Sequence, residues 1–442
     1  MTGKIPVAII GAGPAGLFSA YKLTGEGIEV AIFNRDIKPG GMAEYGIYPT
    51  KRVLKDGLRK QFEQILACER LHYYGNLPVG KNRCLSLSDI FSWGIPAILV
   101  ASGAQGTKWL GIPGETLHGV YHAKDLVYHY NRLPPYSTMP IHIGRRVVIV
   151  GAGNVMADVT RYLITLPQVE EIHICVRRGP AEIKFTRKEL ETIIGAFDLD
   201  ALAQEFERVV PVMRSLGQNP EEEFAFFRET EDKGDFSNGK AKVQMHFLVS
   251  PTEIRGNEDQ TVKSVVLQEN TLVREGDNIL ARGLGIFREF FVDTVIFAIG
   301  DRVESDLGLP LNGNEFLRAQ HPAFPVDGQS YEVEDPQTGE PIKGIFLAGW
   351  ARVPSSGLVG NARKDGVNAA EAVLKFLSQL EGEPGISAME LEDRLVKSHC
   401  PVVRKEDLKR LIEDERKRAI DGDLEKVKYL TNEEMLKIMG LG

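Results

Sequence analysis

The sequence predicts an α/β protein with two separate βαβ units and a helical C-terminal segment. Short apolar runs of strand length recur along the chain, and several of them end in glycine. A strand–glycine turn–helix–strand pattern opens the chain and returns about 140 residues later. Continuous apolar strands are typical of parallel sheets that are covered on both faces. A chain of 442 residues is long enough for two or three domains.

The first βαβ unit lies within the first 33 residues. We expect a strand over 5–10 (IPVAII), the turn GAGPAG, a helix around 17–23 and a second strand over 28–33 (IEVAIF). The second unit has a strand over 146–150 (RVVIV), the turn GAGNVMAD, a helix through Leu163 and a strand over 171–176 (EIHICV). Two such units predict two nucleotide-binding domains.

The remaining elements divide between these domains. We expect a helix over 53–67, charged helices from Glu390 onward, and strands over 71–74, 97–101, 243–249, 261–267, 292–299 and 344–348. The segment between Arg404 and Lys428 contains nine basic and eight acidic residues, a balance that predicts a solvated helix face. The resulting fold class is two Rossmann-like three-layer domains, one discontinuous over 1–103 and 322–442 with the helical C-terminal segment, the other over 104–321.

Composition excludes several classes of protein. Apolar residues make up 43% and charged residues 26%, so a collagen-like, mucin-like or disordered chain is excluded. With 53 basic and 61 acidic residues the net charge is −8, and we expect no binding to nucleic acid or anionic membrane. The N-terminus has no signal-peptide pattern, and no stretch of about 18 apolar residues follows. We therefore expect a cytoplasmic protein without an integral membrane segment.

The four cysteines, Cys68, Cys84, Cys175 and Cys400, are scattered and form no CxxC pair. Their spacing argues against a disulfide framework, a zinc or iron–sulfur site and a dithiol redox centre. We expect four buried thiols in a reducing compartment and no metal site.

The first glycine turn places Gly11, Gly13 and Gly16 in the full G-x-G-x-x-G spacing between a strand and a helix. Such a turn brings the backbone close to a pyrophosphate and points helix N–H groups at it. A glycine-rich loop without a ligand is the alternative, and the flanking strands favour the dinucleotide site. The acidic residue that often holds the ribose is replaced by Asn34 at the end of the second strand, with Asp36 as a less suitable substitute.

The second glycine turn has Gly151 and Gly153, but Met156 occupies the third glycine position. The strand that follows ends at Val176 and continues into Arg177 and Arg178. Guanidinium groups there complement a 2′-phosphate and so favour NADP over NAD. Two solvated surface arginines are the alternative. A chain with an N-terminal FAD-type turn and a later NADP-type turn is typical of a flavoprotein that passes hydride between nicotinamide and flavin.

At this point the chain resembles the adrenodoxin-reductase-type ferredoxin–NADP reductases over nearly its full length. The matching segments are GAGPAGLFSAY, YYGNLPVG, GIPGETLHGVY with YNRLP, GAGNVMADVTRYL, VRRGPAEIKFTRKEL, FLVSPTEI, AGWARVPSSGLVG and YLTNEEMLKIMG. The resemblance implies that 1–103 and 322–442 bind FAD and that 104–321 binds NADP. It adds FAD contacts at Ala15, Asn34, Gly41, Met42, Val79, Trp350, Gly357, Leu358 and Val359. It implies NADP contacts at Ala152, Gly153, Asn154, Val155, Arg177, Arg178, Glu189 and Gly357.

Two departures from the family pattern are visible. The family normally has Glu where Asn34 stands, and Asp-His where this chain has Thr50 and Lys51. The glutamate-synthase small-subunit branch shares both turns and a loop like Tyr45-Gly46-Ile47, but it carries an N-terminal cysteine-rich domain that this sequence does not contain.

The resemblance implies hydride transfer from NADPH to FAD and then single-electron transfer to an iron–sulfur acceptor such as ferredoxin. Hydride transfer requires no protein acid or base. The resemblance implies that Trp350 and Gly357 are the catalytic positions, with Trp350 as a lid or stacking residue at the nicotinamide site; plain core packing of Trp350 is the alternative. Basic clusters at 51–60 and 177–188 are candidates for docking an acidic ferredoxin, with an ordinary solvated face as the alternative for each, whereas 218–235 is acidic. Two alternatives remain: an NAD(P)-linked diaphorase subunit of a larger iron–sulfur complex, and a catalytically silent nucleotide-binding scaffold.

Overall fold

The computed structural model describes residues 3–231, 240–398 and 400–442. The described chain forms two compact units. Unit 1 comprises Met1–Lys108, Tyr128–Thr138 and Gly300–Gly442, and unit 2 comprises Trp109–Val127 and Met139–Ile299. Residues 128–138 and 300–321, expected in the NADP domain, thus lie in unit 1. The division into an FAD domain and an NADP domain stays a prediction.

Unit 1 is built on a six-stranded sheet with the order β18-β19-β5-β2-β3-β4. The strands are β2 (Val7–Ile10), β3 (Val30–Phe33), β4 (Leu71–Tyr74), β5 (Ala97–Val100), β18 (Glu332–Glu334) and β19 (Pro341–Leu347). All neighbours pair in parallel except β18 with β19. The central strands β2, β3 and β5 are buried along their whole length, as both faces of a parallel sheet require.

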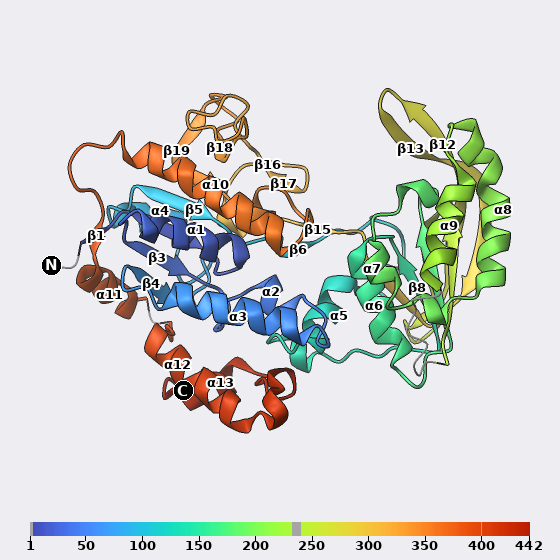
Figure 1. Cartoon of the computed structure of the whole chain (residues 1–442), viewed down its shortest axis with the longest axis horizontal. Helices are drawn as coiled ribbons and strands as arrows, with labels where there is room; N and C mark the ends of the chain where they lie inside the picture. The colour runs from blue at the N-terminus through green and yellow to red at the C-terminus, as the bar shows by residue number, and fades with distance from the viewer. Residues whose placement is uncertain (1–2, 232–239, 399) are drawn as a thin grey trace. The chain divides into compact units, whose positions relative to one another are not determined.

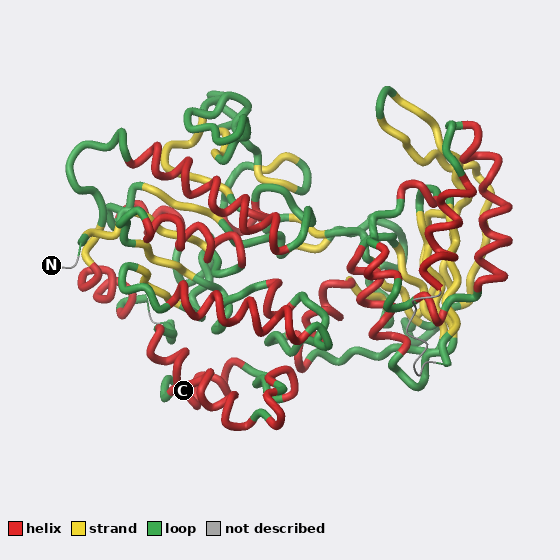
Figure 2. Tube along the Cα trace, viewed as in Figure 1, coloured by secondary structure: helices red, strands yellow, loops and turns green. Residues whose placement is uncertain are grey.

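Alternate residues of these strands enter two hydrophobic cores. Val7, Ile9 and Leu99 pack with helices α1 (Pro14–Gly25), α3 (Arg52–Leu66) and α10 (Val359–Leu377). Ala8, Ile10 and Val100 face the opposite side with helices α4 (Leu87–Ser92) and α11 (Ala388–Val396). The sheet of unit 1 is thus the middle layer of three (Figure 2), and Figure 1 shows α1 and α10 side by side on it. Helices α12 (Lys405–Arg418) and α13 (Asn432–Met439) also pack on the first core.

Unit 2 contains a five-stranded parallel sheet with the order β10-β9-β8-β14-β7. Its strands are β7 (Val120–His122), β8 (Arg146–Val150), β9 (Glu171–Val176), β10 (Lys242–Phe247) and β14 (Thr294–Phe297). An antiparallel sheet of β11 (Val249–Gly256), β12 (Val262–Glu275) and β13 (Asn278–Phe291) shares a core with one face of it. The helices of this unit include α6 (Asn154–Ile164), α7 (Arg187–Leu190), α8 (Leu199–Ser215) and α9 (Pro220–Glu231), and α5 (Ala123–Tyr130) spans the boundary with unit 1.

The short elements join loops to these layers. In unit 1, α2 (Met42–Tyr45) follows the β3 loop, and β1 (Lys4–Ile5) pairs with β20 (Ile386–Ser387). Two further two-stranded pairs are β6 (Gly106–Thr107) with β15 (Asp301–Arg302) and β16 (Leu311–Asn312) with β17 (Glu315–Phe316). Single 3₁₀ turns occur at Tyr136–Thr138, Pro180–Glu182, Ile194–Ala196, Ser305–Leu307, Gly349–Ala351, Ile420–Gly422 and Leu424–Lys426.

The expected fold class is confirmed, and two expectations were wrong. Cys84 and Cys400 form a disulfide across 316 residues of sequence, so only Cys68 and Cys175 are free thiols. Spacing gave no signal because the fold brings the loop after β4 to the segment before α12, where Gly75 and Val403 also pair. The charged stretch 404–428 is not only a solvated face, since Glu415 and Lys428 are buried. The acidic stretch 218–235 contains the whole of α9, and its part from 232 onward lies outside the described residues.

Candidate dinucleotide-binding sites

The first glycine turn (Gly11–Gly16) lies between β2 and α1, and two of its glycines have no room for a side chain. Gly11 has a φ of +105°, and a Cβ there would lie 2.6 Å from the carbonyl oxygen of Ala101. A Cβ on Gly16 would lie 2.1 Å from the carbonyl oxygen of Gly11. Both contacts are to backbone atoms, so only glycine lets α1 start this close to the strand ends.

The middle glycine, Gly13, faces open space, because a Cβ there would meet no protein atom within 4 Å. Gly13 is the N-cap of α1, and Pro14 occupies the first helical position. The first turn of a helix leaves N–H groups without an acceptor inside the helix, and these groups attract phosphate. The open space over a helix N-terminus fits the pyrophosphate of a dinucleotide.

Asn34 connects the end of β3 to this turn. Its Oδ1 accepts a hydrogen bond from the Ala12 N–H at 2.9 Å, and its Nδ2 donates to the carbonyl oxygens of Asp36 and Lys38 at 2.8 and 3.2 Å. The amide is therefore used largely within the protein, where it fixes the turn. The N–H of Leu77 binds the carbonyl of Asn34 at 2.9 Å, which places the loop that carries Val79 beside the same strand end.

A second helix N-terminus belongs to the same unit. Leu358 is the N-cap of α10, Gly357 has a φ of +74°, and Trp350 donates from Nε1 to the carbonyl of Ser356 at 2.8 Å. Helices α1 and α10 touch closely, because Ser19 donates to the carbonyl of Gly366 at 2.7 Å and a Cβ on Gly366 would lie 2.3 Å from the carbonyl oxygen of Ala15. Unit 1 thus holds every residue that the sequence assigned to FAD.

The second glycine turn (Gly151–Met156) lies in unit 2 between β8 and α6. Gly151 has a φ of +128°, and a Cβ there would lie 2.3 Å from the carbonyl oxygen of Ala298. Gly153 again faces open space and is the N-cap of α6. Met156 is completely buried, so its side chain packs into the unit and does not cover the turn.

The loop after β9 is fastened to this second turn. Lys184 N–H binds the carbonyl of Ala152 at 2.9 Å, and Thr186 N–H binds Oδ1 of Asn154 at 3.0 Å. These bonds bring the segment with Glu189 to the residues Ala152–Val155. Arg177 is exposed and Arg178 half-buried, and neither makes an ion pair with a carboxylate within the described residues. Two unpaired guanidinium groups at the end of β9 fit a phosphate ligand.

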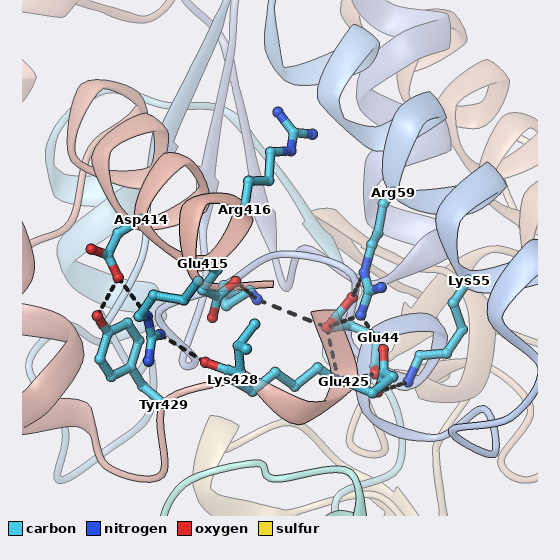
Figure 3. A network of polar contacts seen from close by, with 12 residues as sticks. Glu44, Lys55, Arg59, Asp414, Glu415, Arg416, Glu425, Lys428 and Tyr429 are labelled. Carbon is cyan, nitrogen blue, oxygen red and sulfur yellow. Dashed lines mark hydrogen bonds and ion pairs between the residues drawn. The ribbon is translucent and has the colours of Figure 1, made fainter. Parts of the chain in front are cut away.

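Sequence reasoning missed a network of buried charges in unit 1. We call it the C-terminal charge network, and its members are Lys38, Glu44, Lys55, Arg59, Glu415, Glu425 and Lys428. Figure 3 shows the residues of helix α3 and of the C-terminal segment pointing toward one another. Most of these charges lie far from their partners in the sequence, so spacing along the chain did not reveal the network. Two cations of the basic cluster 51–60, Lys55 and Arg59, are paired in this network, and a role of the cluster in docking an acidic partner stays a prediction.

Within the described residues, no helix is long and apolar enough to cross a membrane, and no group of three or more His, Cys, Asp or Glu residues could hold a metal ion.

Comparison with known proteins agrees with this arrangement. The family model for pyridine nucleotide-disulphide oxidoreductases matches residues 5–195, which include both glycine turns. NADPH-ferredoxin reductase FprA of Mycobacterium tuberculosis (strain CDC 1551 / Oshkosh) is 29% identical over 412 residues, covering 84% of each chain. A solved structure of M. tuberculosis FprA in complex with NADPH superimposes with a TM-score of 0.80 at 25% identity, covering 99% of both chains. The chain is thus similar to NADPH-ferredoxin reductases of the adrenodoxin-reductase type over nearly its full length.

A second relative shows the same likeness. The mitochondrial NADPH:adrenodoxin oxidoreductase of Salvelinus fontinalis is 27% identical over 435 residues, covering 88% of this chain and 83% of that protein. Because the family likeness extends over both units and the C-terminal segment, the resemblance deduced from motifs is confirmed. The roles of individual site residues remain predictions.

Proposed function

We propose that this chain is an FAD-dependent oxidoreductase that transfers electrons between NADPH and a one-electron iron–sulfur acceptor such as ferredoxin. The observation that carries the proposal is the pair of glycine turns, one in each unit, of which the second is followed by two arginines that pair with no carboxylate in the described part of the chain. The likeness to FprA over 99% of the chain supports it. When bound, FAD accepts a hydride from nicotinamide and can release the two electrons one at a time.

In this proposal the residues of the chain bind and orient the two cofactors. The first glycine turn and the N-terminus of α10 hold FAD in unit 1, with Gly41, Met42 and Val79 as further contacts. The second glycine turn, Arg177 and Arg178 hold NADPH in unit 2. Trp350 and Gly357 position the nicotinamide, and no side chain needs to donate or remove a proton for hydride transfer.

The deciding experiment is an absorbance spectrum of the purified protein, followed by anaerobic titration with NADPH and with NADH. We expect a flavin spectrum that NADPH bleaches at lower concentration than NADH does. Protein without flavin absorbance that also takes up no added FAD would contradict the proposal and would favour a silent scaffold.

The acceptor is either a free ferredoxin or a fixed iron–sulfur subunit. Lys55 is buried and the partly buried Arg59 is paired with Glu44, so the cluster 51–60 has fewer free exposed cations than its sequence contains, which weakens the argument for steering a free ferredoxin. Exposed charges are screened within about 8–10 Å at ordinary ionic strength, so reduction of a free ferredoxin slows as salt is added. A flat salt profile together with a co-purifying iron–sulfur subunit would favour the diaphorase alternative.

The cytoplasmic location also stays a prediction. The Cys84–Cys400 disulfide weakens the argument from free thiols on which it partly rested.

A further inference from the structure

The loop Gly40–Ile47 lies directly against the first glycine turn. The Gly40 N–H donates to the carbonyl of Ala12 at 2.7 Å, and a Cβ on Gly41 would lie 3.1 Å from the Cα of Gly13. Gly13 is the open position at the N-terminus of α1. Any shift of this loop therefore changes the space in which the proposed function places the FAD pyrophosphate.

Among the cations that contact this loop, the ammonium group of Lys428 makes the most varied contacts with it. The Lys428 side chain is 2% exposed and comes from the C-terminal segment, almost 400 residues away in sequence. Its Nζ lies 3.0 Å from Oε1 of Glu44 and donates to the main-chain carbonyl of Glu44 at 3.2 Å. The same Nζ lies 5.1 Å from the centre of the Tyr45 ring. Lys428 thus contacts α2 by charge, by main-chain hydrogen bond and by cation–π interaction.

Further contacts fix the ammonium group in place. Nζ of Lys428 also lies 2.8 Å from Oε2 of Glu425 and donates to the carbonyl of Asn131 at 3.3 Å. The C-terminal segment is tied to the same part of the chain by Arg132, which donates to the carbonyl of Lys426 at 2.5 Å, and by Ser137, which donates to the carbonyl of Leu430. The geometry leaves the ammonium little freedom to move away from α2.

The carboxylate that receives Lys428 is itself fully enclosed. Arg59 of α3 binds both oxygens of Glu44 at 2.7 Å, and Figure 3 shows Arg59 and Lys428, the latter from the C-terminal segment, both directed at Glu44. Burial opposes ionisation of Glu44, but Lys428, Lys38 and Arg59 together hold the pKa of its carboxyl well below the usual range. Removing one partner of such a buried ion pair leaves a charge that water cannot reach, which costs far more than losing a surface ion pair.

We propose that Lys428 is a positioning residue of the flavin site, which holds the loop Gly40–Ile47 against the first glycine turn. This inference rests on the proposed FAD binding. It assigns to the C-terminal segment a role in flavin binding that the glycine turns alone do not supply, and it predicts that a charge outside the dinucleotide fingerprint controls flavin retention and flavin potential.

The test compares Lys428→Met and Lys428→Arg holoenzymes with the wild type. For each, the temperature of flavin release is measured by flavin fluorescence, global unfolding by circular dichroism, and the flavin midpoint potential by dye equilibration. We expect Lys428→Met to release flavin well below its global unfolding temperature. We also expect a more negative midpoint potential, because a cation is lost and the Glu44 carboxylate loses a partner. Lys428→Arg, which keeps the charge, should restore most of both properties.

Lys426→Met is the matched control, because Lys426 lies in the same segment but its side chain is 81% exposed. Unchanged flavin release and potential in Lys428→Met, or equal effects in Lys426→Met, would overturn the inference. If Lys428→Met does not fold, the isosteric variant Glu425→Gln removes one carboxylate partner of Lys428. It should lower the flavin-release temperature and leave the global unfolding temperature unchanged. An unchanged flavin-release temperature in Glu425→Gln would equally overturn the inference. A wild type without flavin would instead refute the proposed function.

Discussion

The two glycine turns begin alike and differ in their third position. In both, the first glycine has a positive φ and approaches a strand-end carbonyl, and the second faces open space at a helix N-cap. In the first turn Gly16 lets the helix backbone approach Gly11, whereas in the second turn Met156 takes that position and is buried. The first helical hydrogen bond to the N-cap carbonyl is 3.0 Å from Leu17 and 3.4 Å from Ala157.

This difference indicates that the three glycines of such a turn have separate roles. The first permits the backbone conformation, the second leaves space for phosphate, and the third is required only where the helix lies tightly on the strand end. The residues at the end of the strand after each turn also differ. Asn34 is used within the protein after the first turn, whereas Arg177 and Arg178 have no carboxylate partner among the described residues after the second.

The largest expected effect comes from Gly16→Ala. A Cβ there would lie 2.1 Å from a backbone oxygen that cannot rotate away, so α1 must move from the strand end. Overpacking of this kind costs about 1–3 kcal/mol or more, and we expect flavin affinity to fall about tenfold or more. Gly25→Ala is the matched control in the same helix, because a Cβ there meets no atom within 4 Å. The flavin content of both purified variants is measured by absorbance. Equal flavin content in both would show that the third glycine is not needed for flavin binding.

The next effect concerns the arginines of the second turn. The double variant Arg177→Ala with Arg178→Ala should raise the KM for NADPH about tenfold or more and leave the KM for NADH nearly unchanged, since a hydrogen bond to a charged group contributes about 1.5–3 kcal/mol. Steady-state reduction of a dye acceptor measures both constants. Arg214→Ala, an exposed arginine of unit 2 paired with Glu221, is the control. A parallel rise for both nucleotides would mean that the pair does not bind the 2′-phosphate.

A smaller effect is expected where each turn meets its following loop. Asn154→Ala removes the hydrogen bond to the Thr186 N–H, which contributes about 0.5–1.5 kcal/mol. The KM for NADPH should rise about two- to tenfold while the flavin spectrum stays that of the wild type. A changed flavin content would show that the second turn also supports the flavin site, and the two sites would then not be independent.

Sequence reasoning located the strands that carry both turns because a buried parallel strand is an unbroken apolar run. The strands 71–74, 146–150 and 171–176 have the predicted bounds, and both glycine turns lie where the spacing placed them. Hydrophobic runs did not reveal the features that depend on contacts between distant parts of the chain, namely the disulfide and the buried ion pairs. Cys84 gave no sign of Cys400, and Lys428 resembled its solvated neighbours although it is buried against Glu44.

The last expected effect is on the free energy of unfolding and not on cofactor binding, and it distinguishes the buried charges of unit 1 from surface charges. Lys55 donates to Glu425 at 2.7 Å and to Asn131 at 3.0 Å, and its side chain is fully buried. Burial, aided by the nearby Lys428 ammonium, lowers the pKa of Lys55 from 10.5 to about 7. Between these two pH values the unfolded chain holds a proton that the folded chain has released, so this group makes the free energy of unfolding rise with pH.

Lys55→Met should remove that contribution. Relative to the variant, the wild type should gain stability as the pH rises from about 7 towards 10.5, and the difference should be constant below pH 7, where Lys55 is protonated in both states. Urea unfolding at a series of pH values measures the difference, with Lys60→Met, at an exposed position of the same helix, as the control. Parallel curves for wild type and Lys55→Met would show that the lysine stays charged in the folded state. In that case every cation of the C-terminal charge network would be protonated in the folded protein, and burial in this network would not make stability depend on pH.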